Sequence, residues 1–153
     1  MAAPVQVKGL RELQVKFEKV AGAVASNRYL MGQIGAFVET EILRRTAAGL
    51  DIDENPFPAY SKSYSTWRAK QGRPVDKPDL FFTGSMLSAL TTQETPHQVS
   101  LFFMDTPDKF GMRNPEKAFY NQQLRNFFAL SAKDVDAVQN MVSEHIKKVL
   151  KKG

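Results

Sequence analysis

The chain has 153 residues, of which 42% are hydrophobic and 24% are charged, and its formal net charge is +5 at pH 7. These proportions are typical of one folded domain, which we expect to span residues 1–153, and they exclude a wholly disordered chain. Cysteine is absent, which excludes disulfide bonds, thiolate metal sites and cysteine nucleophiles.

A short strand and two amphipathic helices are predicted in the first third of the chain. Residues 4–9 alternate apolar and polar side chains and end on a glycine, which favours a strand. Apolar residues then recur at helical spacing over residues 10–24 and again over residues 28–48, where Gly49 has the position of a C-terminal cap. Because the two helices follow each other closely, we expect them to form an antiparallel pair.

A long excursion with little regular structure occupies residues 50–79. Its first part is acidic and contains Pro56 and Pro58, and its last part contains Pro74 and Pro78. Between them, the pattern of residues 61–71 predicts a short helix. Irregular stretches of this length usually carry function, so we interpret the excursion as an extended contact loop.

The second half of the chain predicts a small sheet and a long final helix. Thr83 is expected to cap a short helix, residues 91–103 to form a hairpin, and residues 126–130 to form another strand. Ser131 and Asp134 resemble a capping box at the start of the last helix. The sum is an α+β fold, in which two N-terminal helices and a C-terminal helix pack on a small, mainly antiparallel sheet, with a long central loop.

The residues needed for catalysis form no recognisable pattern. His97 and His145 have no partner at metal-ligand spacing. Gly32 and Gly35 lie inside a helical pattern without the strand and third glycine of a phosphate-binding loop, so we expect them to permit close helix packing. No apolar run approaches the roughly 20 residues that a membrane span requires. We expect a soluble protein that is no enzyme, has no membrane partner and binds no cofactor.

The acidic part of the central loop resembles the beginning of a calcium site. Asp51, Asp53 and Asn55 have the spacing of the first three ligands. The glycine at the sixth position and the glutamate at the twelfth are replaced by Phe57 and Ser63, so we expect no metal here.

Two basic regions invite a comparison with nucleic-acid-binding proteins. In residues 60–78 aromatic and basic side chains are mixed, a combination that can stack on bases and bind phosphates. The alternative is a protein-contact loop anchored by Trp67. The second region, at the end of the last helix, consists of Lys147, Lys148, Lys151 and Lys152. Cations there offset the helix dipole, and contact with DNA is the alternative interpretation.

Three short sequence motifs follow one another along most of the chain. Residues 7–13 read Val-Lys-Gly-Leu-Arg-Glu-Leu, residues 78–87 read Pro-Asp-Leu-Phe-Phe-Thr-Gly-Ser-Met-Leu, and residues 125–134 read Arg-Asn-Phe-Phe-Ala-Leu-Ser-Ala-Lys-Asp. In this order and spacing the chain resembles the phage virion-morphogenesis and tail-completion proteins. It departs from them at Phe57, where the family often has tryptophan, and at Asn126, where it often has proline.

The resemblance implies a structural role in a tailed phage. The protein would be a neck or tail-completion subunit that forms a homo-oligomeric ring at the head–tail junction, in the virion and, during assembly, in the host cytoplasm. Implied partners are copies of itself, other neck, connector or tail-terminator proteins and, weakly, genomic DNA. The runner-up from the residues alone is a small basic nucleic-acid-binding module.

The resemblance also places the contact surface in the central loop. Leu80, Phe81 and Phe82 are expected to pin this loop to the core, so that the segment from Asp79 to Leu90 acts as a scaffold. The residues expected to contact neighbouring subunits or partners are Asp51, Asp53, Glu54, Phe57, Tyr60, Tyr64, Trp67, Arg68, Lys70, Arg73 and Lys77.

Overall fold

A computed structural model describes residues 5–8, 12–16, 27–81 and 84–152, and all structural statements refer to these residues. It combines helices with an antiparallel sheet, which confirms the predicted α+β class. The elements in chain order are β1 (Val5–Lys8), β2 (Glu12–Lys16), α1 (Arg28–Ala47), α2 (Lys62–Lys70), α3 (Ser85–Ser88), β3 (Leu90–Glu94), β4 (Gln98–Phe103), α4 (Asn114–Leu124) and α5 (Ala132–Lys152).

The described strands form one sheet in the order β1-β2-β4-β3, and all neighbours are antiparallel. β3 and β4 are the hairpin predicted over residues 91–103, with Leu90 opposite Phe103 and Glu94 opposite Val99. β4 also pairs with β2, so it lies inside the sheet. Its buried residues, which include Val99, Leu101 and Phe103, therefore belong to the core.

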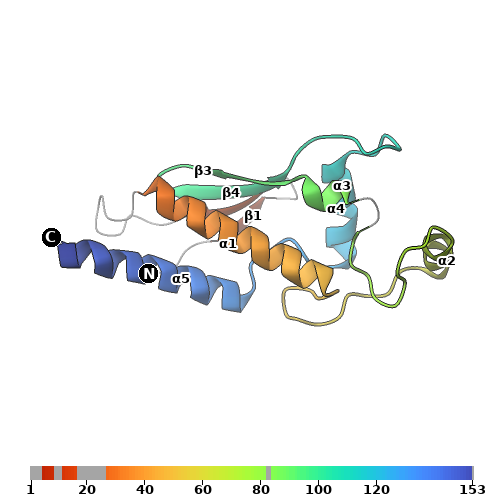
Figure 1. Cartoon of the computed structure of the whole chain (residues 1–153), viewed down its shortest axis with the longest axis horizontal. Helices are drawn as coiled ribbons and strands as arrows, with labels where there is room; N and C mark the ends of the chain where they lie inside the picture. Colours follow the sequence, from red (N-terminus) through yellow and green to blue (C-terminus); the bar gives the residue numbers. More distant parts are fainter. Residues whose placement is uncertain (1–4, 9–11, 17–26, 82–83, 153) are drawn as a thin grey trace.

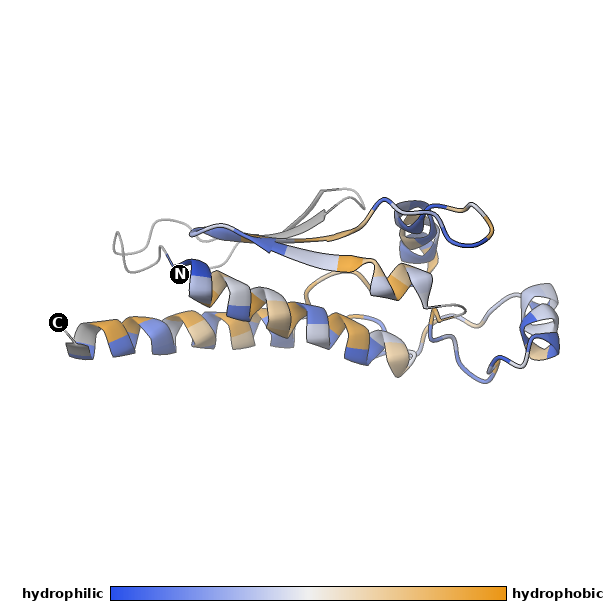
Figure 2. Ribbon diagram, turned by 45° about the horizontal axis from the view of Figure 1, so that its top comes forward, coloured by the Kyte–Doolittle hydropathy of each residue, from blue (hydrophilic) through white to orange (hydrophobic). Residues whose placement is uncertain are grey.

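The two long helices cover one face of this sheet. α1 packs on β3 and β4 and also contacts α5, which runs beside it in the opposite direction (Figure 1). In Figure 2 the two helices again lie side by side below the sheet. The predicted apolar face of α1 is confirmed by its buried residues Leu30, Ile34, Val38 and Ile42. The helix ends as predicted, with Gly49 in the left-handed region at φ +75°.

The helix predicted over residues 10–24 is wrong where the structure describes it. Residues 12–16 form β2, and the rest of the predicted helix lies outside the described residues. Apolar and polar residues also alternate from Glu12 to Lys16, so the segment satisfies both periods. Antiparallel pairing on both sides, with β1 and β4, provides backbone hydrogen-bond partners that the helical pattern could not reveal.

The strand predicted over residues 126–130 is also wrong. Phe127 and Phe128 are both buried, whereas consecutive residues of a strand point to opposite faces. Their backbone N–H groups donate to the side chain of Gln122, over N–O distances of 3.2 and 2.9 Å, and not to a neighbouring strand. Both rings pack on Phe103, so this segment is an irregular plug at the end of the core.

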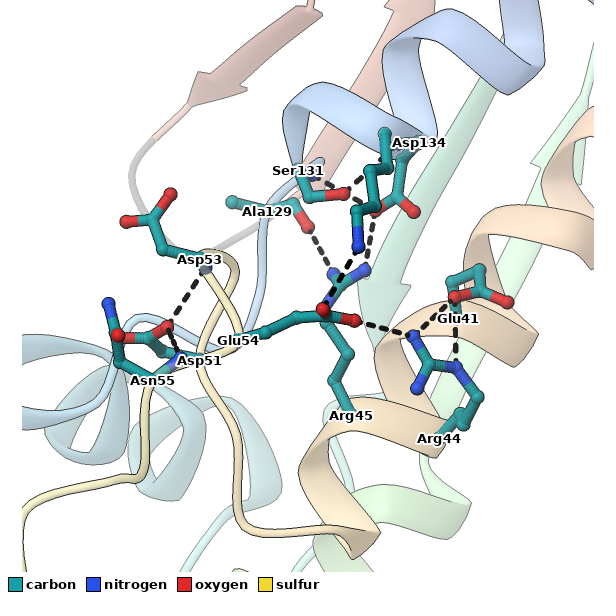
Figure 3. Close-up of polar contacts among 11 residues, drawn as sticks. Glu41, Arg44, Arg45, Asp51, Asp53, Glu54, Asn55, Ala129, Ser131 and Asp134 are labelled. Atoms are coloured by element: carbon teal, nitrogen blue, oxygen red, sulfur yellow. Dashed lines mark hydrogen bonds and ion pairs between the residues drawn. The ribbon is translucent and has the colours of Figure 1, made fainter.

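A buried ion pair joins the end of α1 to the start of α5 (Figure 3). Arg45 donates to the Asp134 carboxylate over 2.6 Å, and their side chains are only 2% and 3% exposed. A second donor of Arg45 reaches the carbonyl of Ala129 at 2.9 Å. Asp134 accepts from the Ser131 N–H, and the Ser131 hydroxyl accepts from the Asp134 N–H, which confirms the predicted capping box.

Close packing between α1 and the sheet depends on Gly35. A Cβ atom at this position would lie 2.7 Å from Cγ2 of Val99 on β4, well inside van der Waals contact. The expectation that glycine permits close packing is thus confirmed for Gly35. It is wrong for Gly32, where a Cβ atom would meet nothing within 4 Å.

We therefore expect opposite effects from the same change at two positions of one helix. Gly35→Ala should lower the free energy of unfolding by about 1–3 kcal/mol, because the added methyl group forces Val99 or the helix to move. Gly32→Ala should raise it by about 0.5–1 kcal/mol, because alanine favours the helix and has room. Urea denaturation measures both, and equal effects would contradict the helix–sheet contact described here.

Two adjacent positions on α5 give a second matched pair. Asp134→Ala should lower the free energy of unfolding by about 3–5 kcal/mol, because it leaves the buried Arg45 charge unpaired. Lys133→Ala should leave the unfolding midpoint unchanged, because its ion pair with Glu54 is on the surface. Similar losses in both variants would show that the buried pair does not join the two helices.

Candidate functional site

The segment that contains α2 projects from one end of the molecule, beyond the end of α1 (Figure 1). We call residues 58–81 the α2 arm. Arg68 closes it: the guanidinium donates to the carbonyls of Pro74 and Phe81, at 3.1 and 3.0 Å, and lies 3.4 Å from the carboxylate of Asp79. Arg68 is only 1% exposed, so its side chain fills the interior of the arm. In a larger unit, apolar side chains would fill that space.

Tyr60 connects the arm to the rest of the protein. The guanidinium carbons of Arg68 and Arg125 lie over its ring, 4.7 and 4.9 Å from the centroid. Its hydroxyl accepts from the backbone N–H of Leu80 at 3.1 Å, where the returning chain adopts a left-handed φ of 57°. Burial raises the pKa of the Tyr60 hydroxyl, which therefore stays neutral. Two cations and one hydrogen bond thus converge on a single ring.

Arg125, directly after α4, holds the beginning of the arm. It donates to the carbonyls of Pro58 and Ala59, at 3.1 and 3.3 Å, across more than 60 residues of sequence. Only 6% of its surface is exposed, and burial lowers the pKa of its guanidinium. The arm is therefore fixed to α4 mainly through backbone carbonyls, which almost any sequence could supply.

An open pocket of about 560 Å³ lies between the arm and α4. Its floor includes the buried side chains of Leu80 and Met86. Large apolar side chains from α2, from the loop before α4 and from α4 itself stand around it, each 36–67% exposed: Tyr64, Trp67, Phe110, Met112, Tyr120 and Leu124. Groups of exposed apolar residues like this one are typical of surfaces that bind another molecule.

Local contacts hold the two sides of this pocket in place. On the arm, the rings of Tyr64 and Trp67 stack with their centroids 5.7 Å apart. In the opposite loop, the carboxylate of Asp108 accepts from the N–H groups of Phe110 and Met112, at 2.8 and 3.0 Å. Its other oxygen lies 2.6 Å from Nζ of Lys117. Hydrogen bonding to that ammonium group is the main reason why the pKa of Asp108 is lowered.

The structure places the predicted contact residues of the arm in three environments. Tyr64 and Trp67 line the pocket, and Lys70 and Lys77 are exposed on the surface. Tyr60 is half-buried, as is Arg73, whose guanidinium lies over the Phe81 ring at 5.6 Å.

Phe57 and Arg68, which were also predicted as partner contacts, are both buried. Phe57 is 5% exposed and belongs to the hydrophobic core, and Arg68 is 1% exposed. Phe57 attaches the central loop to the hydrophobic core, and Arg68 closes the arm through its hydrogen bonds to Pro74 and Phe81. Arg68 nevertheless belongs to the lining of the pocket between the arm and α4.

The acidic part of the predicted contact loop does not belong to the arm. It lies against the ends of α1 and α5 (Figure 3), where Glu54 forms an ion pair with Lys133 at 3.0 Å. The carboxylate of Asp51 accepts from the backbone N–H groups of Asp53 and Asn55, both at 2.9 Å. These carboxylates organise their own loop, so the excursion divides into a docked acidic turn and a projecting arm.

The basic residues at the end of α5 lie far from the arm. Lys147, Lys148 and Lys151 are exposed, and Figure 1 shows this end of the helix opposite the end that carries α2. The side chain of Lys152 lies outside the description. The two basic regions predicted from the sequence therefore do not form one continuous surface.

The scaffold predicted around residues 79–90 is confirmed in part. Leu80 is buried, as expected, whereas Phe81 is 42% exposed and therefore does not pin the loop to the core. Phe82 and the predicted cap Thr83 lie outside the described residues. α3 instead begins after Gly84, which has a left-handed φ of 83°.

The side of the pocket that α4 and the loop before it form was missed in the sequence. Phe110, Met112, Tyr120, Leu124 and Arg125 line it, yet none of them was predicted as a site residue. The sequence did carry one signal, because the spacing of Tyr120 and Leu124 puts them on the same side of a helix. In the structure both are exposed, while Ala118 of the same helix is buried.

Comparisons with protein-family models, with curated proteins and with solved structures gave no match. Over the described residues, no group of three or more histidine, aspartate and glutamate side chains is arranged to hold a metal ion. None of the described helices has the length and hydropathy of a membrane span.

The hydroxyl of Tyr60 gives a test of how the arm is attached. Tyr60→Phe should lower the free energy of unfolding by about 1 kcal/mol and speed hydrogen exchange at the Leu80 N–H, which loses its acceptor while the ring remains. Tyr120→Phe is the matched control, because no hydrogen bond of its hydroxyl is seen among the described residues. Unchanged protection of Leu80 in Tyr60→Phe would contradict this attachment.

Proposed function

We propose that this protein is a structural subunit of a tailed phage, a neck or tail-completion protein that assembles into a ring at the head–tail junction. The observation that carries the proposal is the convergence of exposed apolar side chains on the pocket between the arm and α4. Exposed apolar groups of this kind are typical of surfaces that another protein covers. The three ordered sequence segments support the assignment to a phage particle.

The way in which the arm is held suits an assembly surface. Arg68, Tyr60 and Arg125 fix its conformation before any partner arrives. A surface that is ordered in advance loses less conformational entropy on binding, so more of the contact energy remains as affinity. In a ring, the pocket of one subunit would meet a different surface of the next, as in other head-to-tail contacts. Further copies, connector proteins and tail-terminator proteins are the proposed partners.

A nucleic-acid-binding module is the second candidate, and the stacked pair of Tyr64 and Trp67 is the observation that favours it. The pair, however, faces a pocket that it shares with Met112 and Leu124, and the lysines at the end of α5 lie at the opposite end of the molecule. A basic groove that follows a strand of nucleic acid would need these groups together. We therefore propose at most a weak contact with genomic DNA.

Particle assembly tests the proposed function directly. A phage genome without this coding sequence should produce filled heads and separate tails that fail to join, as seen by electron microscopy. The unmodified protein should restore joining, as should Lys62→Gln, which changes an exposed residue of the arm outside the pocket. The double variant Trp67→Asp, Leu124→Asp should not, because it puts charges on the apolar rim. Normal particles without the protein would refute the proposal.

A further inference from the structure

The pocket carries an excess of positive charge that its apolar rim does not explain. Its charged lining residues are Arg68, Lys117, Arg125 and Asp108. The carboxylate of Asp108 is already paired with Lys117, and Arg68 lies 3.4 Å from Asp79. Arg125 is the exception, because no carboxylate of the described residues contacts it.

The surroundings of Arg125 leave part of its guanidinium available to the pocket. Nε and Nη2 donate to the carbonyls of Pro58 and Ala59, while Nη1 makes no hydrogen bond to a described residue. Tyr60 lies beside it as a neutral ring. A largely buried charge without a counter-ion is costly, and an anion brought to it would be held more strongly than on an open surface.

We propose that the pocket binds an acidic, apolar segment of a partner protein, with a carboxylate of that segment paired to Arg125 and an apolar side chain packed against the aromatic rim. The proposal rests on the assembly role above and names the chemistry of the partner. A carboxylate there would accept a charge-assisted hydrogen bond from Nη1 of Arg125, which is stronger than a hydrogen bond between neutral groups. Exposed Trp67 and Tyr120 are of the residue types that dominate protein interfaces.

The arrangement favours a protein segment over a nucleic acid. The exposed lysines of the arm, such as Lys62 and Lys70, are not among the residues that line the pocket, so a phosphate backbone following them would bypass it. A single carboxylate next to an apolar side chain fits both the charge and the walls.

A pair of small probes tests this chemistry on the full-length protein. 3-Phenylpropionate carries a ring and a carboxylate, and 3-phenylpropanamide has nearly the same shape without the charge. We expect the carboxylate to bind about tenfold more tightly than the amide, in roughly the millimolar range. The fluorescence of Trp67, the only tryptophan, and the NMR signal of Arg125 Nε–H report the binding. Equal affinities, or shifts that spare both signals, would overturn the proposal.

Two variants with the same change in net charge locate the effect. Arg125→Gln should abolish the preference for the carboxylate, because glutamine keeps a donor for the arm but not the charge. Lys62→Gln should keep the preference, since Lys62 lies on the arm outside the pocket. A preference that survives in Arg125→Gln would overturn the proposal. If Arg125→Gln does not fold, the probe pair and the Arg125 signal of the unmodified protein decide alone.

Failure of this inference is distinguishable from failure of the assembly role. If heads and tails need the protein to join but the pocket ignores the carboxylate, only the chemistry proposed for the partner is wrong. If the pocket prefers the carboxylate but particles form normally without the protein, only the assembly role is wrong and the pocket serves a different acidic protein.

Discussion

The buried ion pair between Arg45 and Asp134 is the interaction on which the rest of the structure depends. It joins the end of α1 to the start of α5, and the same carboxylate also belongs to the capping box that begins α5. Because a buried charge that loses its partner is costly, neither helix end can move without the other. The acidic turn is docked over this junction through Glu54 and Lys133. The arm therefore leaves from a fixed base.

The arm uses the same residue type in a different way. Arg68 and Arg125 are buried among backbone carbonyls and the ring of Tyr60, and of the two only Arg68 also has a carboxylate partner, Asp79 at 3.4 Å. The arm is too small to have a hydrophobic core, so these guanidinium groups hold it by several hydrogen bonds each. The arm therefore does not bury the aromatic side chains of α2 in its interior. Tyr64 and Trp67 line the pocket instead.

What the sequence could predict was determined by how local each signal is. The helical patterns of α1, α2 and α5 and the β3–β4 hairpin depend on neighbouring residues, and all were recognised. β2 depends on pairing with β4, and residues 126–130 depend on the side chain of Gln122, so both were misread. At the site, Tyr64 and Trp67 were recognisable from composition. Arg125 was not, because its partners are carbonyls more than 60 residues away.

The order of the helices and strands along the chain has a consequence for synthesis on the ribosome. α1 packs against β3, β4 and α5, all of which leave the ribosome after it, and Asp134 follows Arg45 by 89 residues. A nascent chain therefore carries an unpaired cation and an uncovered apolar helix face until α5 has emerged. The aromatic residues of α2 likewise appear before Arg125 can position them. The fold described here is therefore complete only after α5 has been synthesised.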